Sequence, residues 1–245
     1  MPRYDFRTPR LYVDAPLAGG GAVLFGRDQA NYLLNVLRLD RGEEILVFNG
    51  RNGEWRARLA GTGKRMLTAE PIELVREQPP GADLHFLFAP IKHTRLDYMV
   101  QKAVEMGASL LRPVITRHTQ VARVNLERMR SNVVEAAQQC GILNLAEVAE
   151  PADFAEAVAD DGRLLIFCDE HADVQDPVAA LKAAPRLLLS LIIGPEGGFS
   201  DDERAALIKR ENVARIALGP RILRADTAAV AALAVVQAVL GDWRA

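Results

Sequence analysis

Two turns rich in glycine and proline follow apolar runs in the C-terminal part of the chain. Residues 192–203 read IIGPEGGFSDDE, and residues 217–227 read ALGPRILRADT. A glycine turn between a strand and a helix commonly binds phosphate at the helix N-terminus. Neither turn has the Gly-Lys-Ser/Thr sequence of a P-loop or the G-x-G-x-x-G sequence of a dinucleotide site. The two turns therefore indicate chemistry other than phosphate binding.

Acidic residues in the first turn indicate which kind of ligand it could accept. Glu196 lies inside the turn, and Asp201 and Asp202 follow it where the next helix should begin. Ser200 and Glu203 have the spacing of a capping box, and acids in a first turn stabilise a helix but repel phosphate. If the two preceding strands are neighbours in one sheet, both turns lie at its carboxyl edge. The resulting cleft would suit a flat or cationic ligand bound through main-chain groups, as an adenine ring can be.

The elements that must position these turns form an alternating pattern from about residue 84 onward. Apolar runs of strand length occur at 84–88, 163–168 and 187–194, and helical patterns at 95–107 and 125–141 each end in glycine. Continuous apolar runs are typical of parallel strands that are covered on both faces. Strands that alternate with helices predict an α/β fold with a mostly parallel sheet.

The first 75 residues follow a different pattern, rich in short strands. Residues 43–55 contain two Asn-Gly pairs between apolar runs and predict a hairpin, and only one short helix is expected, at 28–37. Gln78 to Gly81, with two prolines, cannot continue a helix or a central strand. The sequence therefore predicts a small β-domain at 1–76 and a larger domain at 77–245.

Composition and charge narrow the class of protein. The chain is 49% hydrophobic and 25% charged, with a formal net charge of −2. This balance argues against a bulk nucleic-acid binder but leaves room for a local basic patch. Cys140 and Cys168 stand far apart and outside any C-x-x-C pair, which predicts no disulfide and no metal site. The N-terminus lacks the apolar segment of a signal peptide, and residues 227–240 are short for a membrane span. We therefore expect a cytoplasmic protein.

Basic residues cluster in the predicted β-domain. The first thirteen residues include Arg3, Arg7 and Arg10, and residues 51–65 hold five basic residues against one acid, Glu54. Positive residues on one strand face are typical of a nucleic-acid platform. A solvated sheet face is an equally good interpretation of the charge pattern, so both alternatives stay open at this point.

Taken together, the two turns resemble the signature of the SPOUT superfamily of knotted methyltransferases, and more narrowly that of the RsmE family. The resemblance covers nearly the whole chain. PRLYV (9–13) and YLLNVLRLDRGE (32–43) resemble the family's N-terminal PUA-like domain. KHTRLDYMVQKAVEMGASLLRPV (92–114) and EAAQQCG (135–141) resemble its catalytic domain. Several motifs in the family's order are far more specific than one glycine turn.

The resemblance implies a fold, a reaction and partners. The fold would be α/β, with a mostly parallel sheet and a C-terminal trefoil knot, plus a PUA-like β-barrel domain that binds RNA. The family methylates ring nitrogen N(3) of one uridine in the 16S rRNA of the 30S ribosomal subunit. Its cofactor is S-adenosylmethionine, and its members are homodimers through the catalytic domain. No membrane is implied.

Carried over residue by residue, the resemblance assigns both turns to the cofactor. An acidic turn fits this ligand, because the methyl donor carries a sulfonium cation in place of a row of phosphates. Glu196 would either favour that positive charge or order the loop. The residues expected to bind the cofactor are Gly194, Pro195, Glu196, Gly197, Gly198, Leu218, Gly219, Ile222, Leu223, Arg224 and Thr227.

Methylation at N(3) requires the uridine to lose its ring proton, and a cation would stabilise the negative charge that develops. Arg224 is the first candidate for this role and Arg10 the second, with Glu196 as a further catalytic candidate. His93 is the candidate proton acceptor, and a plain loop histidine is the alternative.

Contact with RNA is expected from basic residues of both domains, since phosphate contacts position an RNA while a pocket reads the base. For Lys102, an ion pair with Glu105 along the same helix is an equal alternative. The expected RNA-binding residues are Arg3, Arg7, Arg10, Arg38, Lys92, Arg95 and Lys102.

Two positions depart from the family pattern. After Gly141 the family usually has an arginine and then a proline, whereas this chain continues ILNLAEV. Asp226 stands where the family usually has glutamate. Methylation of another RNA, such as tRNA, therefore stays open as an alternative. A relative that binds RNA but has lost catalysis is the other alternative, although a pure binding module would not need intact glycine turns.

Overall fold

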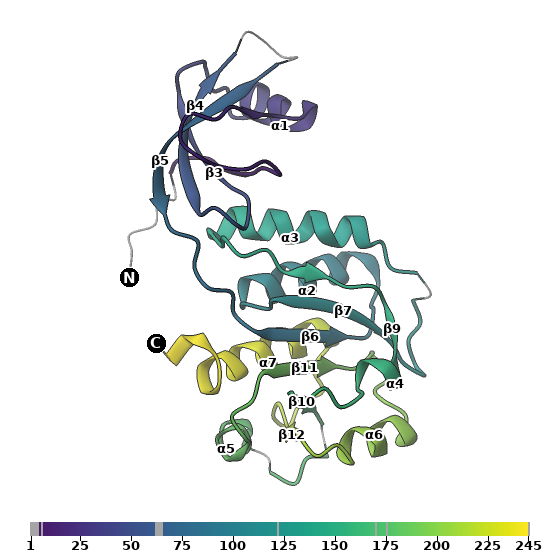
Figure 1. The fold of residues 1–245 in the computed structure, drawn as a ribbon. Helices are drawn as coiled ribbons and strands as arrows, with labels where there is room; N and C mark the ends of the chain where they lie inside the picture. Colours follow the sequence, from purple (N-terminus) through teal and green to yellow (C-terminus); the bar gives the residue numbers. More distant parts are fainter. Residues whose placement is uncertain are drawn as a thin grey trace. The chain divides into compact units, whose positions relative to one another are not determined.

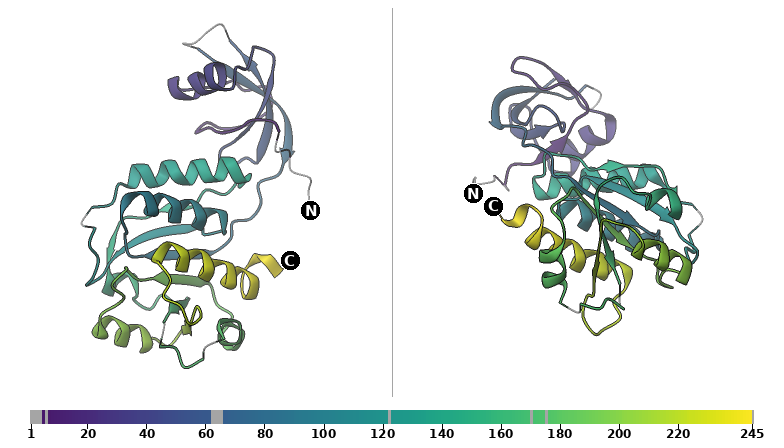
Figure 2. Two further views of the ribbon diagram at one scale, coloured as in Figure 1. Left: turned by 180° about the vertical axis from the view of Figure 1, so that it is seen from behind. Right: turned by 60° about the horizontal axis from the view of Figure 1, so that its bottom comes forward.

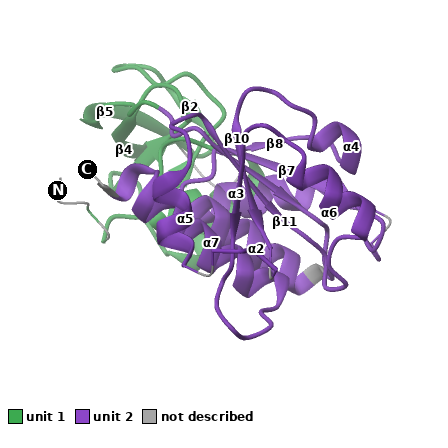
Figure 3. Cartoon of the chain, turned by 90° about the horizontal axis from the view of Figure 1, so that it is seen from below, with its two compact units in different colours: residues 1–80, 137–145 green, residues 81–136, 146–245 purple. Residues whose placement is uncertain are grey.

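The computed structural model describes residues 5, 7–61, 66–121, 123–169, 171–174 and 176–244. The chain forms two compact units, which Figure 3 shows in different colours. Unit 1 comprises residues 1–80 and 137–145, and unit 2 comprises residues 81–136 and 146–245. The sequence pattern predicts a division at 76–77 and gives no sign that 137–145 belongs with the first unit.

Unit 1 is built on a curled sheet in the strand order β1-β3-β4-β5-β2. A short helix, α1, continues directly into a π-helical turn, η1 (Figure 1). Together they cover residues 27–36, where the sequence predicts one helix at 28–37. The elements of this unit are β1 (Arg10–Tyr12), β2 (Val23–Leu24), α1 (Arg27–Asn31), η1 (Tyr32–Val36), β3 (Glu44–Phe48), β4 (Glu54–Ala60) and β5 (Thr68–Arg76).

The hairpin predicted at 43–55 is confirmed. Strands β3 and β4 pair antiparallel, with Phe48 opposite Glu54. Gly50 and Gly53 have φ of 80° and 76°, which L side chains rarely adopt. A Cβ at Gly53 would also lie 2.3 Å from the carbonyl oxygen of Arg76. The backbone of this turn therefore favours the glycine of each Asn-Gly pair.

The two faces of β4 have different neighbours. Ala57 and Leu59 are buried in the core of unit 1. On the opposite face, Arg56 lies 3.1 Å from Glu73 and Arg58 lies 3.1 Å from Glu44. The basic side chains of this strand thus pair with acids of neighbouring strands, which supports the solvated-face interpretation over a nucleic-acid platform.

Unit 2 contains a parallel sheet in the order β12-β10-β11-β6-β7-β8, with β9 pairing to β7. The predicted α/β fold with a mostly parallel sheet is confirmed, while the trefoil knot stays a prediction. The strands are β6 (Leu84–Phe88), β7 (Leu110–Ile115), β8 (Glu147–Val148), β9 (Ala152–Asp153), β10 (Leu164–Cys168), β11 (Leu189–Ile193) and β12 (Val213–Ile216).

Helices cover both faces of this sheet. Helix α7 contacts β11 and lies beside α2 on one face (Figure 2), while residues of α4 and α6 pack with Leu165, Phe167 and Ile192 on the other. Burial on both faces explains why β10 and β11 read as continuous apolar runs. The helices are α2 (His93–Glu105), α3 (Leu126–Cys140), α4 (Phe154–Ala157), α5 (Pro177–Ala183), α6 (Asp201–Ile208), α7 (Ala225–Val239) and the 3₁₀ turn η2 (Asp242–Arg244).

Helix α6 begins with the predicted capping box. The Ser200 hydroxyl accepts a hydrogen bond from the Glu203 amide, and the Glu203 carboxylate accepts one from the Ser200 amide at 2.8 Å. Glu203 is buried, and its second oxygen accepts a hydrogen bond from the Arg117 amide at 2.7 Å. The capping glutamate therefore fastens the start of α6 to the segment that follows β7. No helix in the described part of the chain is long and apolar enough to cross a bilayer.

Candidate functional site

A cavity of about 460 Å³ opens at the carboxyl end of the sheet in unit 2. The strands that precede the two glycine-proline turns are β11 and β12, and they are not neighbours because β10 lies between them. Both turns nevertheless contribute to one cavity, since the end of β10 supplies a third wall that the sequence pattern did not reveal. The lining residues are Phe167, Cys168, Asp169, His171, Ile193, Gly194, Pro195, Glu196, Gly197, Gly198, Phe199, Asp201, Arg204, Ile222, Leu223, Ala225 and Ala228.

The first turn, Gly194 to Gly198, lines the cavity along its whole length. The Gly198 amide donates to the Pro195 carbonyl at 2.9 Å and closes a tight turn. Gly198 has a φ of 69°, and a Cβ at Gly194 would lie 2.9 Å from the ring of Phe199. Glycine is therefore required at both ends of the turn, by conformation at one and by close approach at the other.

Glu196 connects the first turn to helix α2 through an ion pair with Arg95. Its carboxylate lies 2.5 Å from Arg95 Nη1, and the two side chains are 50% and 37% exposed. A pair this exposed contributes at most about 1 kcal/mol. The contact supports the loop-ordering role for Glu196 and gives Arg95 a partner other than RNA.

The second turn contributes fewer of its predicted residues. Ile222 and Leu223 line the cavity, and Ile222 is 95% exposed. Leu218, Gly219, Arg224 and Thr227 are not among the lining residues. Arg224 is the N-cap of α7 and is exposed, and it pairs with no acid in the part of the chain that the structure describes.

Asp169, at the end of β10, is a site residue that the sequence analysis missed. Its carboxylate is 2% exposed and accepts hydrogen bonds from Arg204 Nη2 and Arg215 Nε, each at 2.9 Å. The His171 amide donates a third, at 3.0 Å. Burial alone would raise the pKa of Asp169, but the hydrogen bonds from Arg204, the His171 amide and Arg215 outweigh it and hold the pKa below its ordinary value. The sequence feature that could have identified Asp169 is its position as an acid directly after a buried strand.

The position of Asp169 explains how two turns on separated strands are held together. Arg204 belongs to α6, which follows the first turn, and Arg215 belongs to β12, which precedes the second. One buried carboxylate directly after β10 thus connects the helix that follows the first turn with the strand that precedes the second. Burial raises the pKa of the neighbouring Cys168 thiol to about 12, which disfavours the nucleophilic thiolate at neutral pH.

The predicted RNA-binding residues are in different environments. Arg7, Arg38 and Lys92 are exposed, whereas Arg3 lies outside the described residues. Lys102 Nζ lies 2.7 Å from the Glu105 carboxylate. This is the ion pair that the helical spacing predicted as the alternative to RNA binding. His93 begins α2, and its side chain lies outside what the structure describes.

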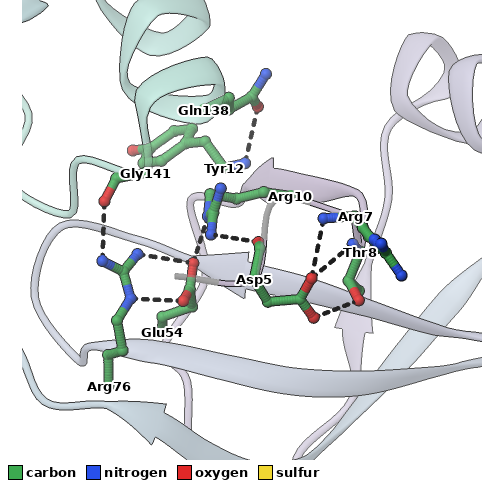
Figure 4. A network of polar contacts seen from close by, with 9 residues as sticks. All are labelled: Asp5, Arg7, Thr8, Arg10, Tyr12, Glu54, Arg76, Gln138 and Gly141. Atoms are coloured by element: carbon green, nitrogen blue, oxygen red, sulfur yellow. Dashed lines mark hydrogen bonds and ion pairs between the residues drawn. The ribbon is translucent and has the colours of Figure 1, made fainter. Parts of the chain in front are cut away.

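Arg10 lies in a buried ion cluster of unit 1 (Figure 4). Its guanidinium contacts Glu54, and the two side chains are 5% and 3% exposed. Arg76 Nε lies 2.7 Å from the same carboxylate, and Arg76 Nη1 donates to the Gly141 carbonyl at 3.0 Å. The structure therefore gives Arg10 a structural partner, and its roles in catalysis and RNA binding stay predictions.

Glu54 is charged despite its burial. Burial would raise its pKa, but hydrogen bonds from Arg76 and Arg10 outweigh this effect and hold the pKa below its ordinary value. The segment that departs from the family pattern lies nearby in unit 1. Leu143 is buried with Phe48 and Ala137, and Ile142 and Leu145 pack against this cluster. The apolar residues that follow Gly141 thus have a packing role here.

Comparisons with known proteins agree with this arrangement. Residues 77–237 match a family model described as an RNA methyltransferase domain, and residues 25–72 match an RNA methyltransferase PUA domain. The ribosomal RNA small subunit methyltransferase E of Rickettsia conorii is 30% identical over 93% of this chain and 94% of its own length. The enzyme of the same name from Synechocystis is 34% identical over 86% of this chain and 71% of its own length.

Solved structures give the same result. The ribosomal RNA small subunit methyltransferase E of Neisseria gonorrhoeae, crystallised with S-adenosylmethionine, has a TM-score of 0.82 and 25% identity, and the match covers 94% of this chain and 97% of that chain. A Legionella pneumophila structure with bound S-adenosylmethionine has a TM-score of 0.80 and 29% identity, over 95% and 98% of the two chains. With both glycine turns contributing to one cavity, matches to both family models and a relative that is 30% identical along almost its full length, the chain belongs to the RsmE family of small-subunit ribosomal RNA methyltransferases.

Proposed function

We propose that the chain transfers a methyl group from S-adenosylmethionine to ring nitrogen N(3) of one uridine in 16S rRNA, the nucleotide numbered 1498. We further propose that it acts on the 30S subunit in the cytoplasm, as a homodimer. The observation that carries the proposal is the cavity walled by both glycine turns. Family membership supports the substrate class, and the resemblance of the sequence motifs supports the choice of uridine N(3).

The residues around the cavity fit the proposed cofactor. Phe167, Phe199, Ile222 and Leu223 line the cavity with apolar side chains that suit a planar ring system, and the glycines of the first turn also line it. The acids Glu196 and Asp201 also line the cavity and suit a cationic ligand. The cofactor supplies an electrophilic methyl group on a sulfonium sulfur. The chain supplies the apolar walls, the main-chain groups and the nearby negative charge that would hold it.

Catalysis in this proposal depends on charge at the acceptor base. A uridine that loses its N(3) proton develops negative charge on the ring, and a cation placed there lowers the barrier. Arg224 meets the requirement best among the predicted catalytic residues, because it is exposed beside cavity residues Leu223 and Ala225. Arg10 is buried against Glu54 in unit 1, so it would first have to leave this carboxylate.

Transfer of a labelled methyl group tests the proposed function directly. The full chain would be incubated with labelled S-adenosylmethionine and with isolated 30S subunits, naked 16S rRNA or bulk tRNA, followed by nucleoside analysis. We expect label in N(3)-methyluridine from the 30S subunits or the 16S rRNA. Label in tRNA alone would replace the proposed substrate, and cofactor binding without transfer to any RNA would indicate an RNA-binding relative without catalysis.

Replacement of Arg224 by alanine should lower kcat about 100-fold, because the loss of one group that stabilises developing charge typically costs this much. The dissociation constant for S-adenosylmethionine should change little. Single-turnover methylation at saturating cofactor measures the first quantity and isothermal titration calorimetry the second. Arg221→Ala is the matched control, because this arginine is exposed in the same loop. An equal loss in the control would show that both residues only attract RNA.

Replacement of Glu196 by glutamine should weaken cofactor binding by about twofold to fivefold, the range expected for an exposed ion pair. Arg95→Gln breaks the same pair but keeps the acid. If Glu196 acts through loop order, both variants bind more weakly. If Glu196 acts on the cationic ligand, only Glu196→Gln binds the cofactor more weakly. Unchanged affinity and unchanged methylation rate in Glu196→Gln would remove both roles.

A further inference from the structure

His118 contacts the first glycine turn although it lies far from it in the sequence. Its Nδ1 lies 3.2 Å from the carbonyl oxygen of Gly197 and 3.1 Å from that of Gly198. His118 is exposed and is not among the residues that line the large cavity. Gly197 and Gly198 do line this cavity. The histidine therefore contacts the turn without lining the large cavity, and it lines a smaller pocket together with Pro195, Glu196 and Gly197.

Hydrogen-bonding chemistry fixes the role of the ring nitrogen. A carbonyl oxygen can only accept, so Nδ1 must carry the proton and donate it. This holds for the neutral ring with its proton on Nδ1 and for the charged ring alike. Nδ1 of His118 is therefore the hydrogen-bond donor to the turn in both the neutral and the charged form of the ring.

The segment that carries His118 is itself fixed. The Thr116 amide donates to Thr119 Oγ1 at 2.9 Å, and the Thr119 amide donates back to the Thr116 carbonyl at 3.1 Å. Between them, the Arg117 amide donates to Glu203, the residue that caps α6. His118 thus projects from a closed turn that is already attached to the helix following the glycine turn.

Fixing a carbonyl also fixes the amide next to it. All peptide bonds of the described chain are trans, and in a trans peptide the C=O and the following N–H point in opposite directions. When His118 holds the Gly198 carbonyl, the orientation of the Phe199 amide is set as well. A turn with glycines at 197 and 198 would otherwise sample many backbone conformations.

We propose that His118 is a positioning residue that holds the glycine turn in its cofactor-binding conformation through donation from Nδ1 to the Gly197 and Gly198 carbonyls. The inference rests on the proposed function for the identity of the cofactor. It assigns to the segment after β7 a part in cofactor binding, without placing the histidine in contact with the methyl donor or the uridine.

Amide replacements of His118 separate its two nitrogens. Asparagine can place an N–H donor near the position of Nδ1, whereas glutamine places its amide near Nε2. We expect His118→Ala and His118→Gln to raise the dissociation constant for S-adenosylmethionine by about tenfold, as the loss of one or two hydrogen bonds would. His118→Asn should stay within about twofold of wild type. Isothermal titration calorimetry with the full chain measures all three values.

Hydrogen exchange of the turn provides a readout that needs no cofactor. In the cofactor-free chain, the amides from Gly197 to Ser200 should exchange about tenfold faster in His118→Ala and His118→Gln than in wild type or His118→Asn. Gln120→Ala is the matched control, since Gln120 is an exposed residue of the same segment, and it should change neither quantity. Circular dichroism and chemical denaturation of each variant show whether the fold is intact.

The outcomes distinguish this inference from the proposed function. Equal affinity and equal exchange in all variants would overturn the positioning role. So would a lower kcat at saturating cofactor in His118→Asn with an unchanged dissociation constant, because the histidine would then act on RNA or in the chemical step. If wild type binds S-adenosylmethionine but methylates no 16S rRNA, the proposed substrate fails while the His118 series still gives its answer. If it binds no cofactor, hydrogen exchange alone decides the positioning role.

Discussion

Replacement of Glu54 by glutamine should lower the free energy of unfolding by about 4 kcal/mol, among the largest effects that we expect in this chain. Glu54 is 3% exposed between Arg10 and Arg76, whose side chains are 5% and 18% exposed. Removal of the carboxylate charge leaves two buried guanidinium groups without an opposite charge. The Arg76 contact to the Gly141 carbonyl would weaken with it, and so would the attachment of residues 137–145 within unit 1.

Trp55 is a suitable probe for this measurement. It belongs to β4 next to Glu54 and packs against the core of unit 1. The only other tryptophan of the chain is Trp243, so urea unfolding followed by fluorescence in a Trp243→Phe background reports on unit 1. Glu44→Gln is the matched control, since Glu44 is 36% exposed and pairs with Arg58 at the surface. Its loss should cost less than about 1 kcal/mol. A similar small cost for Glu54→Gln would contradict a stabilising ion cluster.

The same cluster predicts a pH dependence. The pKa of Glu54 is lower in the folded chain than its ordinary value of 4.5. A depressed carboxyl pKa contributes stability that is fully present above the unfolded value and is lost as pH falls through the folded value. The stability difference between wild type and Glu54→Gln should therefore be constant near neutral pH and shrink as pH falls below about 4.5. A difference that does not change with pH would show that folding does not lower the pKa of Glu54.

Replacement of Asp169 by asparagine should weaken both the fold and cofactor binding. Asp169 is 2% exposed, but Arg204 and Arg215 are 31% and 22% exposed and can be partly hydrated after the change. We therefore expect a loss of about 3 kcal/mol in the free energy of unfolding, toward the lower end for a broken buried pair. Because Asp169 connects α6 with β12, the dissociation constant for S-adenosylmethionine should also rise, by about tenfold or more.

Asp173→Asn is the matched control for Asp169. Asp173 pairs with Arg215 Nη1 at 3.0 Å but is 89% exposed, so its loss should cost less than about 1 kcal/mol. Urea unfolding measures stability, and calorimetry at a temperature where the variant is fully folded measures affinity. Normal cofactor affinity in a folded Asp169→Asn variant would contradict the view that this carboxylate holds the two turns together.

Local sequence patterns predicted the parts of this chain whose structure depends on near neighbours. The capping box of Ser200 and Glu203 and the hairpin with its two Asn-Gly pairs were readable because turns and caps involve residues a few positions apart. Continuous apolar runs identified β10 and β11 as central strands, because burial on both faces favours an apolar residue at nearly every position. The glycine turns could likewise be predicted from the sequence, because each lies within a few consecutive residues.

Residues that depend on contacts between distant segments could not be predicted in this way. The sequence shows Glu54 only as the one acid among the five basic residues of 51–65, whereas the structure buries it between Arg10 and Arg76. The contact between Lys102 and Glu105, by contrast, could be predicted from helical spacing alone, because both residues lie on one helix. Asp169 and His118 gave weak signals, because an acid or a histidine after a strand has many possible partners.

The sequence by itself determined that this chain has a parallel α/β unit, a small β-rich unit and two glycine turns whose motifs match one methyltransferase family. The two units and the turns follow from periodicity, turn chemistry and glycine conformation, which act over a few residues, while the family match rests on the resemblance of the motifs. Only the tertiary structure decided that β10 lies between the strands that precede the two turns, that Asp169 links α6 with β12, and that His118 contacts the first turn. Strand order and the partners of a buried charge depend on how distant segments pack, and the local pattern of residues carries no record of that packing.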